Sequence, residues 1–272
     1  MPLATLLMGA ALAATPASPT CSTGTVPIGG IPLYVDRQGS GPLTVLFESG
    51  NGNDSHVWDQ IEPQVRALGV VTLRYDRRGY GESAPRREQT YRVEQDLAVV
   101  KELLDRCSGR GPVLYVAHSY GGVLGLLTSR TDRRIKGLVL VDTVAPGVET
   151  VAMAKAQRAE LRPQYAEVRQ QAPALAQAII PVVEALPETT AIINAARIST
   201  ALPITDIVAN GGNDDAPDRA ETWRQGHRRF VAAAPGMREL IDARDSSHKV
   251  MADKPALVLA AIGEMVRRLT GR

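Results

Sequence analysis

A serine lies where an apolar run of the chain meets two glycines. Residues 113–118 are of the kind that form a buried strand, and Ser119 follows them directly, ahead of Tyr120-Gly121-Gly122. A serine on a sharp turn between a strand and a helix presents its hydroxyl above the sheet, and such a turn has room only for small residues two positions to either side. Gly121 meets this demand, and Ala117 stands where glycine is usual. The stretch is predicted to be a nucleophile elbow; an ordinary serine after a strand is the alternative.

A base is needed to take the proton from a serine hydroxyl, and an imidazole serves this purpose best. Of the four histidines, His248 is the best candidate because it lies in a loop between the last expected strand and the last expected helix. His118 adjoins the serine and is expected to point away from it. His56 belongs to a glycine-rich loop, and His227 lies in an arginine-rich helical stretch where it is expected to be a solvated surface residue.

Two aspartates are candidates for the carboxylate that would orient this imidazole. Asp142 follows the apolar run 137–141, and Asp214 lies after the next expected strand in a Gly-x-x-Asp-x-x-Pro pattern. Asp142 is favoured because a buried strand should hold its carboxylate rigidly. The loop 210–218, with two glycines and three aspartates, is typical of a mobile, solvated segment. Asp214 remains the alternative acid.

Backbone N–H groups are expected to bind the negative charge that develops on a substrate carbonyl. The glycine-rich loop 50–53 follows the apolar run 43–47, and its glycines allow the backbone to turn tightly. The predicted donors are the N–H groups of Asn51 in this loop and of Tyr120, the residue after the serine. A plain turn between a strand and a helix is the alternative for the loop.

The elements that must position these loops alternate between strands and helices. After a hairpin-like start at 26–35, strands are expected at 43–47, 70–75, 113–118, 137–141, 204–209 and 238–243, and helices at 58–68, 92–106, 121–130, 223–233 and 255–269. This order predicts an α/β fold with a mostly parallel sheet covered by helices on both faces. Ligands of such sheets bind at the carboxyl ends of the strands, where all the loops named above lie.

A helical cap is predicted at about residues 146–202. The composition changes there to alanine, glutamine, arginine and glutamate with scattered isoleucine and leucine, and prolines at 163, 173, 181 and 187 are expected to break the segment into short helices. We therefore expect one domain over residues 21–272 that carries this cap as an insertion over the sheet.

The first 20 residues are predicted to be a secretory signal or a simple apolar segment. Leu3 to Ala14 is apolar but too short to span a bilayer, and Ala11 and Ala13 offer an A-x-A-like cleavage site. The expected location is therefore periplasmic or secreted, without stable membrane insertion, and cytoplasmic is the alternative. In an oxidising compartment Cys21 and Cys107 could form a disulfide, although sequence alone does not settle their pairing.

Charge and cysteine patterns argue against other classes of partner. Lysine and arginine number 31 against 29 aspartates and glutamates, and no block of five like charges occurs, so nothing indicates a nucleic-acid partner. Neither cysteine lies in a pattern typical of a metal or redox site. We expect a small-molecule substrate and neither cofactor nor metal; the oligomeric state is not indicated.

Four features of this chain, in this order, resemble the α/β-hydrolase family over about residues 26–270: the loop 50–53, the serine elbow, an acid after a strand and a late histidine. The segment 76–83, Asp-Arg-Arg-Gly-Tyr-Gly-Glu-Ser, is similar to the family's D-R-x-G-x-G-x-S loop. Ser49-Gly50-Asn51 stands where many members have His-Gly-x, so Ser49 replaces the common histidine.

The resemblance implies an α/β-hydrolase fold and a serine nucleophile. The family also contains haloalkane dehalogenases and epoxide hydrolases, but a serine rather than an aspartate at the elbow argues against both. The expected function is hydrolysis of a carboxylic ester or lactone through an acyl-serine intermediate, carried out by Ser119, Asp142 and His248. Hydrolysis of an amide, peptide or C–C bond on the same residues is one alternative, and a catalytically silent binding protein is another.

Overall fold

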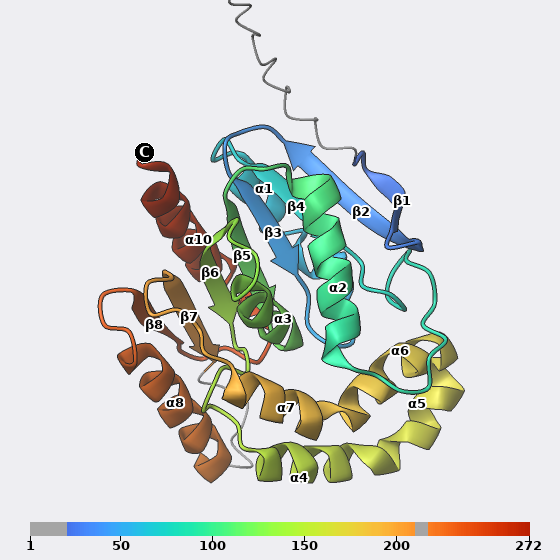
Figure 1. Ribbon diagram of the computed structural model, residues 1–272. Helices are drawn as coiled ribbons and strands as arrows, with labels where there is room; N and C mark the ends of the chain where they lie inside the picture. The colour runs from blue at the N-terminus through green and yellow to red at the C-terminus, as the bar shows by residue number, and fades with distance from the viewer. Residues whose placement is uncertain (1–20, 210–216) are drawn as a thin grey trace, which may run out of the picture.

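The computed structural model describes residues 21–209 and 217–272, and these residues form one sheet between helices (Figure 1). The strand order in this eight-stranded sheet is β1-β2-β4-β3-β5-β6-β7-β8. The two pairings β1–β2 and β2–β4 are antiparallel, and every later pairing is parallel. The sheet is therefore mostly parallel, as the alternation of strands and helices predicts. Its strands are β1 Gly24–Ile28, β2 Ile31–Gly39, β3 Thr44–Glu48, β4 Val71–Tyr75, β5 Val113–His118, β6 Ile135–Val141, β7 Ile204–Ala209 and β8 Arg238–Ala243.

The strand register brings three chain segments to one edge of the sheet. Glu48 at the end of β3 pairs with Ala117 of β5, and His118 at the end of β5 pairs with Val141 at the end of β6. The loops that follow these three strands therefore start side by side. Because the parallel strands β3, β5 and β6 end at the same level, the segments that follow them lie together, namely residues 49–53, Ser119 and Asp142.

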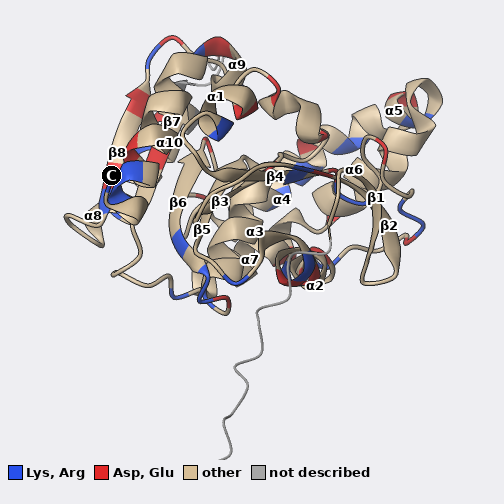
Figure 2. Cartoon of the chain, turned by 90° about the horizontal axis from the view of Figure 1, so that it is seen from above, with Lys and Arg blue, Asp and Glu red and all other residues tan. Residues whose placement is uncertain are grey.

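Helices cover both faces of the sheet, and a separate apolar core lies under each. Successive residues of the central strands alternate between the two cores: Leu46, Tyr115 and Leu138 belong to one, and Phe47, Val116 and Val139 to the other. Helices α2 and α3 pack in the first core, and α1 and α10 in the second, on opposite sides of the sheet in Figure 2. Because both faces are buried, the strands read as continuous apolar runs. The helices are α1 Glu62–Arg66, α2 Val93–Leu103, α3 Tyr120–Ser129, α4 Val151–Leu161, α5 Tyr165–Gln171, α6 Pro173–Glu184, α7 Leu186–Ala195, α8 Pro217–Ala232, α9 Val250–Asp253 and α10 Pro255–Thr270.

The helix expected over residues 58–68 is wrong in its first half. A short 3₁₀ turn, Ser55–Trp58, comes first, and α1 begins only at Glu62 with Pro63 in its first turn. Proline lacks an N–H and cannot lie within a helix without breaking a hydrogen bond, so it favours a new helix start. Trp58 is fully buried and packs on Phe47 with ring centroids 5.2 Å apart.

Four helices, α4 to α7, lie at the end of the sheet toward which β3, β5 and β6 point (Figure 1). Pro173 and Pro187 occupy first turns of α6 and α7, as proline does at helix starts. Pro181, expected to break the segment, instead lies inside α6. Helix α6 reaches the glycine-rich loop, because a Cβ on Gly52 would lie 3.9 Å from Cγ2 of Ile179.

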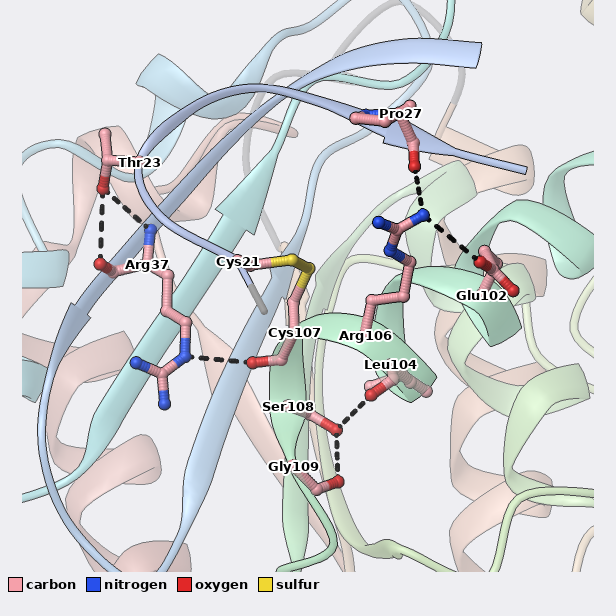
Figure 3. The surroundings of a disulfide bond; sticks show 10 residues. All are labelled: Cys21, Thr23, Pro27, Arg37, Glu102, Leu104, Arg106, Cys107, Ser108 and Gly109. Carbon is pink, nitrogen blue, oxygen red and sulfur yellow. Dashed lines mark hydrogen bonds and ion pairs between the residues drawn. A yellow bond between two sulfur atoms is a disulfide. The ribbon is translucent and has the colours of Figure 1, made fainter. Parts of the chain in front are cut away.

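A disulfide joins Cys21, ahead of β1, to Cys107, just after α2 (Figure 3). The carbonyl of Cys107 also accepts a hydrogen bond from Nε of Arg37 in β2, 3.0 Å away. The disulfide therefore ties the antiparallel edge of the sheet to the helix that covers it.

The helices and the charged residues of the described chain give no long apolar or single-sign surface element. In residues 21–209 and 217–272, no single helix is long and apolar enough to cross a membrane; α6 and α7 reach that length and composition only as a pair bent by 51°. Acidic and basic segments are interspersed over the fold, as Figure 2 shows.

Candidate active site

Ser119 sits between β5 and α3 in a backbone conformation that side chains rarely adopt. Its φ is 52° and its ψ is −124°. Such a conformation costs about 1–3 kcal/mol and persists only where the surroundings hold it. The N–H of Ser119 donates to the carbonyl of Val141, 3.0 Å away, and its own carbonyl accepts from Thr143 Oγ1 at 3.1 Å. The turn predicted around the serine is thus present, held by the strand next to it.

Gly121 is required because the loop after β3 lies so close to it that no side chain would fit. Its own backbone angles do not require glycine. A Cβ at this position would lie 2.6 Å from Glu48 Cγ and 2.6 Å from the carbonyl oxygen of Ser49. Real Cβ atoms do not approach backbone that closely, so any other residue would push α3 away from the loop. Gly121 therefore lets Ser119 and the loop 49–53 lie side by side.

Three side chains from distant parts of the chain form one hydrogen-bonded series. Nε2 of His248 lies 2.9 Å from Oγ of Ser119, and Nδ1 of His248 lies 2.6 Å from Oδ2 of Asp142. A carboxylate can only accept, so Nδ1 carries the ring proton and Nε2 is left to accept the hydroxyl proton of Ser119. Asp142 is buried, while the side chain of His248 is 54% exposed. The arrangement can therefore move a proton from serine to imidazole at a solvent-accessible surface.

The second oxygen of Asp142 is also held. Oδ1 accepts from the N–H of Ala209 at 3.0 Å and from the indole N–H of Trp223 in α8 at 3.1 Å. Burial raises the pKa of Asp142, but the hydrogen bond and charge of His248, with the bonds from Ala209 and Trp223, outweigh it, so the pKa lies below its ordinary value. The carboxylate is thus kept ionised. Asp214, the alternative acid, lies outside the described residues.

His118 points away from Ser119, and its ring faces the main chain of the His248 loop. Its Nε2 lies 2.9 Å from the carbonyl oxygen of His248. Burial lowers the pKa of His118 to about 3, with the nearby His248 ring acting in the same direction. The ring is therefore neutral, and because a carbonyl only accepts, Nε2 is the nitrogen that donates. A Cβ on Gly50 would lie 2.7 Å from Nδ1 of this ring, so Gly50 is required by close contact with it.

His227 is not on the surface, and the expectation that it is solvated is wrong. Its side chain is fully buried, and Nδ1 lies 2.7 Å from Oδ2 of Asp206, itself fully buried in β7. The ring meets that of Trp223 edge-on, with centroids 5.0 Å apart. Trp223, His227 and Phe230 lie four and three residues apart, which is the spacing of one helix face. The two arginines that directly follow His227 are exposed. The arginine-rich composition therefore concealed a buried helix face that the spacing of the apolar residues would have revealed.

The two predicted N–H donors lie in different elements, Asn51 in the loop after β3 and Tyr120 at the start of α3. Asn51 lies inside a turn closed by a hydrogen bond from the N–H of Asn53 to the carbonyl of Gly50 at 3.3 Å, so its own N–H takes no part in that bond. The N–H of Tyr120 lies in the first turn of α3, where a helix offers no acceptor. Gly52 has a φ of 84°, which glycine adopts freely.

Arg77 is a site residue whose part in the arrangement the sequence did not reveal. Its guanidinium is buried and donates to the carbonyls of Ser49 and Gly50, the latter at 2.6 Å, and to Oε1 of Glu48 at 2.7 Å. The motif 76–83 carries a family resemblance but does not indicate these contacts. The signal that could have found them is an arginine two residues after a buried strand, with a glutamate at the end of the neighbouring strand.

The described part of the chain contains no group of three or more histidine, cysteine, aspartate or glutamate residues that could hold a metal ion.

Trp223 is a second site residue, besides Arg77, whose role the sequence did not reveal. A single tryptophan in a polar helix gave no indication that it would donate a hydrogen bond to Asp142.

Comparison with known proteins gives relatives of several activities. The model of the alpha/beta hydrolase family matches residues 45–261. A haloalkane dehalogenase of Mesorhizobium japonicum is 35% identical over 114 residues, which are 42% of this chain and 36% of that protein. The chain therefore matches less than half of the length of such curated relatives.

Among solved structures, the epoxide hydrolase VrEH1 of Vigna radiata has a TM-score of 0.67 at 18% identity, covering 90% of this chain and 97% of its own. A thermophilic esterase of Thermogutta terrifontis has a TM-score of 0.61 at 20% identity, covering 91% and 97%. These structural likenesses concern the fold. Because the family model matches residues 45–261, which are most of the chain, the chain belongs to the alpha/beta hydrolase family.

Proposed function

We propose that this protein is a serine hydrolase that cleaves a carboxylic ester or lactone. The observation that carries the proposal is the series from Ser119 through His248 to Asp142, with contacts of 2.9 and 2.6 Å. Serine is a poor nucleophile until a base takes its proton, and this series supplies both the base and the carboxylate that orients it.

The reaction has two halves. Nε2 of His248 takes the proton from Ser119, whose Oγ attacks the acyl carbon and forms a tetrahedral oxyanion facing the N–H groups of Asn51 and Tyr120. The intermediate collapses as the alkoxide leaves with the proton from His248, and the acyl group stays on Ser119. Water then gives a proton to His248 and attacks the acyl carbon, and the proton returns to Ser119 as the acid is released. Each N–H donor contributes about 3 kcal/mol to stabilising the oxyanion.

The nucleophile favours this reaction over those of two relatives. Relatives of the chain include a haloalkane dehalogenase and an epoxide hydrolase, but a serine rather than an aspartate at the elbow argues against both activities here. A serine hydroxyl forms an ester with the acyl group of its substrate, so Ser119 suits acyl transfer to water. Amide, peptide or C–C bond hydrolysis uses the same residues and stays the second candidate.

A labelled fluorophosphonate tests the proposal, because it forms a covalent bond only with an activated serine. We expect labelling of the wild-type protein and none of Ser119→Ala, with thermal unfolding curves that show both to be folded. A panel of p-nitrophenyl esters, lactones and aminoacyl amides then separates the substrate classes. Failure of the folded wild-type protein to be labelled at Ser119 would refute the proposal and favour a catalytically silent binding protein.

Asp142 is the acid that we propose, with Asp214 as the alternative. Asp142→Asn should lower kcat by about 10⁴-fold, because the imidazole would lose its orientation and its charge stabilisation. Asp214→Asn should change kcat little, since the one N–H of the His248 ring that faces an acid already donates to Asp142. The reverse result in ester hydrolysis by the two purified variants would transfer the role to Asp214.

We also propose that the protein is exported, to the periplasm or the medium. The disulfide between Cys21 and Cys107 supports this, because such bonds persist in oxidising compartments and are rare in the cytoplasm. An intact N-terminus at Met1 in protein isolated from its native host would rule out cleavage of a signal peptide.

A further inference from the structure

Arg77 contacts the back of the loop that carries one of the proposed oxyanion donors. Its side chain is 3% exposed and its partner Glu48 is fully buried. Nη2 donates to the carbonyl of Gly50 at 2.6 Å, while Nη1 donates to the carbonyl of Ser49 and to Oε1 of Glu48. One guanidinium therefore holds two successive carbonyls at the start of the loop.

The carbonyl of Gly50 and the N–H of Asn51 belong to the same peptide group. A peptide group is planar and trans, so its C=O and N–H point in opposite directions. A donor that fixes the direction of the Gly50 carbonyl consequently fixes the direction of the Asn51 N–H. Hydrogen bonds in series also polarise one another, and a charged donor on the carbonyl makes the N–H of that peptide a stronger donor.

Arg77 is well suited to this position because it keeps its charge there. Burial lowers the pKa of Arg77, but Glu48 more than compensates, and the pKa is raised well above its ordinary value. Oε2 of Glu48 accepts from the hydroxyls of Tyr75 at 2.6 Å and Tyr115 at 2.9 Å. Burial raises the pKa of Glu48 above its ordinary value, while Arg77 and the two tyrosine hydroxyls favour the ionised form. The geometry, with both oxygens accepting hydrogen bonds, is that of a carboxylate counter-ion.

The same guanidinium also lies near two tyrosine rings, one that hydrogen-bonds Asn51 and one that belongs to Tyr120 itself. It lies 5.1 Å from the ring centroid of Tyr80, whose hydroxyl donates to Oδ1 of Asn51 at 2.5 Å. It lies 5.9 Å from the ring centroid of Tyr120. Arg77 is thus in contact with the structure around Asn51 and around Tyr120, the two residues whose N–H groups are to meet the oxyanion.

We propose that Arg77 is a positioning residue of the reaction, which aims and polarises the Gly50–Asn51 peptide toward the developing oxyanion. The inference rests on the proposed serine hydrolase function and goes beyond it, because it gives a buried ion pair outside the Ser119–His248–Asp142 series a share in transition-state stabilisation. The ordinary alternative is that Arg77 and Glu48 only hold the fold together.

The test must avoid leaving Glu48 as an unpaired buried charge. The double variant Arg77→Met, Glu48→Gln removes both charges, and glutamine still accepts from Tyr75 and Tyr115. Glu48→Gln alone is the matched control, since it keeps Arg77. Arg78→Met is the second control, because Arg78 is a neighbouring arginine that pairs with Glu88 at the surface. Urea unfolding curves establish that each variant is folded.

The measurements are kcat and KM for the best p-nitrophenyl ester, and inhibition by a trifluoromethyl ketone. Ser119 adds to this ketone and gives a stable oxyanion, so its Ki reports on the donors, whereas the corresponding trifluoromethyl alcohol gives no oxyanion. Relative to Glu48→Gln, we expect the double variant to lose about 10–100-fold in kcat with KM little changed, part of the effect of removing a whole donor. The ketone's Ki should rise by a similar factor, and binding of the alcohol should not change.

A purely structural role would not produce this pattern. A kcat of the double variant within twofold of Glu48→Gln, or a fall in kcat without a parallel rise in the ketone's Ki, would overturn the inference. Should the double variant not fold, Arg77→Lys replaces it: lysine keeps the charge without the guanidinium fork, so kcat and the ketone's Ki must again change together. Fluorophosphonate labelling of wild-type protein separates the two failures, since unlabelled Ser119 refutes the proposed function and this inference with it.

Discussion

Replacing His118 by glutamine should make the protein more resistant to acid. The ring of His118 is buried and neutral, with a pKa of about 3 in the folded protein, whereas an unfolded chain has a histidine pKa of about 6.5. Between these values the unfolded chain binds more protons than the folded one. Stability is therefore lost as the pH falls from about 6.5 toward about 3.

The size of the effect follows from the two pKa values. At pH 4.5 the unfolded histidine is protonated and the folded one is not, and linkage gives a loss of about 2.5 kcal/mol relative to pH 7. His118→Gln removes this proton uptake. Glutamine is a suitable replacement because its Nε2 also carries hydrogens that can donate to the carbonyl of His248, as the ring does at 2.9 Å.

Urea unfolding of both proteins at pH 7 and pH 4.5 measures the difference. Wild-type protein should lose about 2.5 kcal/mol more than His118→Gln between the two pH values, whatever the absolute stability of the variant. His56→Gln is the matched control of opposite sign: His56 is exposed and paired with Asp59 at 2.9 Å, and that hydrogen bond raises its pKa, so folding favours its protonation and this variant should lose slightly more stability than the wild type between pH 7 and pH 4.5. Equal losses in wild type and His118→Gln would refute the prediction, because they would mean that the buried ring titrates as it does in the unfolded chain.

Two further predictions concern the surroundings of the site and the disulfide. Trp223→Phe should lower kcat about 10-fold with KM little changed. Phenylalanine keeps an aromatic ring at this position, but Asp142 loses a charge-assisted hydrogen bond of 3.1 Å. Unchanged kcat in steady-state ester hydrolysis would show that the N–H of Ala209 holds the carboxylate alone. Cys107→Ser should lower the free energy of unfolding by about 2–4 kcal/mol, because its bond to Cys21 restricts the unfolded chain. Urea titration without reductant measures this, and wild type treated with reductant should match the variant. Equal stability of the oxidised wild type and the variant would refute the prediction.

The order of elements could be predicted because it depends on local patterns. The central strands β3 and β5 are buried along their whole length and are mainly apolar, and β7 and β8 span the predicted residues 204–209 and 238–243. The elbow could be predicted as well, since the steric demand of a tight turn acts on residues next to it in the chain. The start of α1 was missed because Pro63 moved it beyond Trp58, although proline's preference for a first turn is itself a local rule.

The surroundings of individual polar side chains were harder to predict from the sequence. His227 was expected on the surface because arginines surround it in the sequence, yet it is buried against Asp206, 21 residues away. Likewise, Arg77 could be noticed as part of a motif, but its contact with Glu48 depends on two neighbouring strands ending at the same level. Pairings of this kind follow from strand register, which no single segment of the sequence specifies.

The sequence by itself therefore determined the kind of fold, the strained serine and the histidine that serves it best, because each depends on residue types within a short stretch. Only the tertiary structure decided that Asp142 lies within 2.6 Å of His248, that Trp223 holds the other oxygen of that carboxylate and that Arg77 holds the loop before Asn51. The physical reason is that hydrogen bonds are effective over about 3 Å, and only the packing of sheet and helices brings groups from distant segments within that distance. Ser119 is the point where the two kinds of information meet: a local turn makes its conformation, and residues far along the chain determine what it can do.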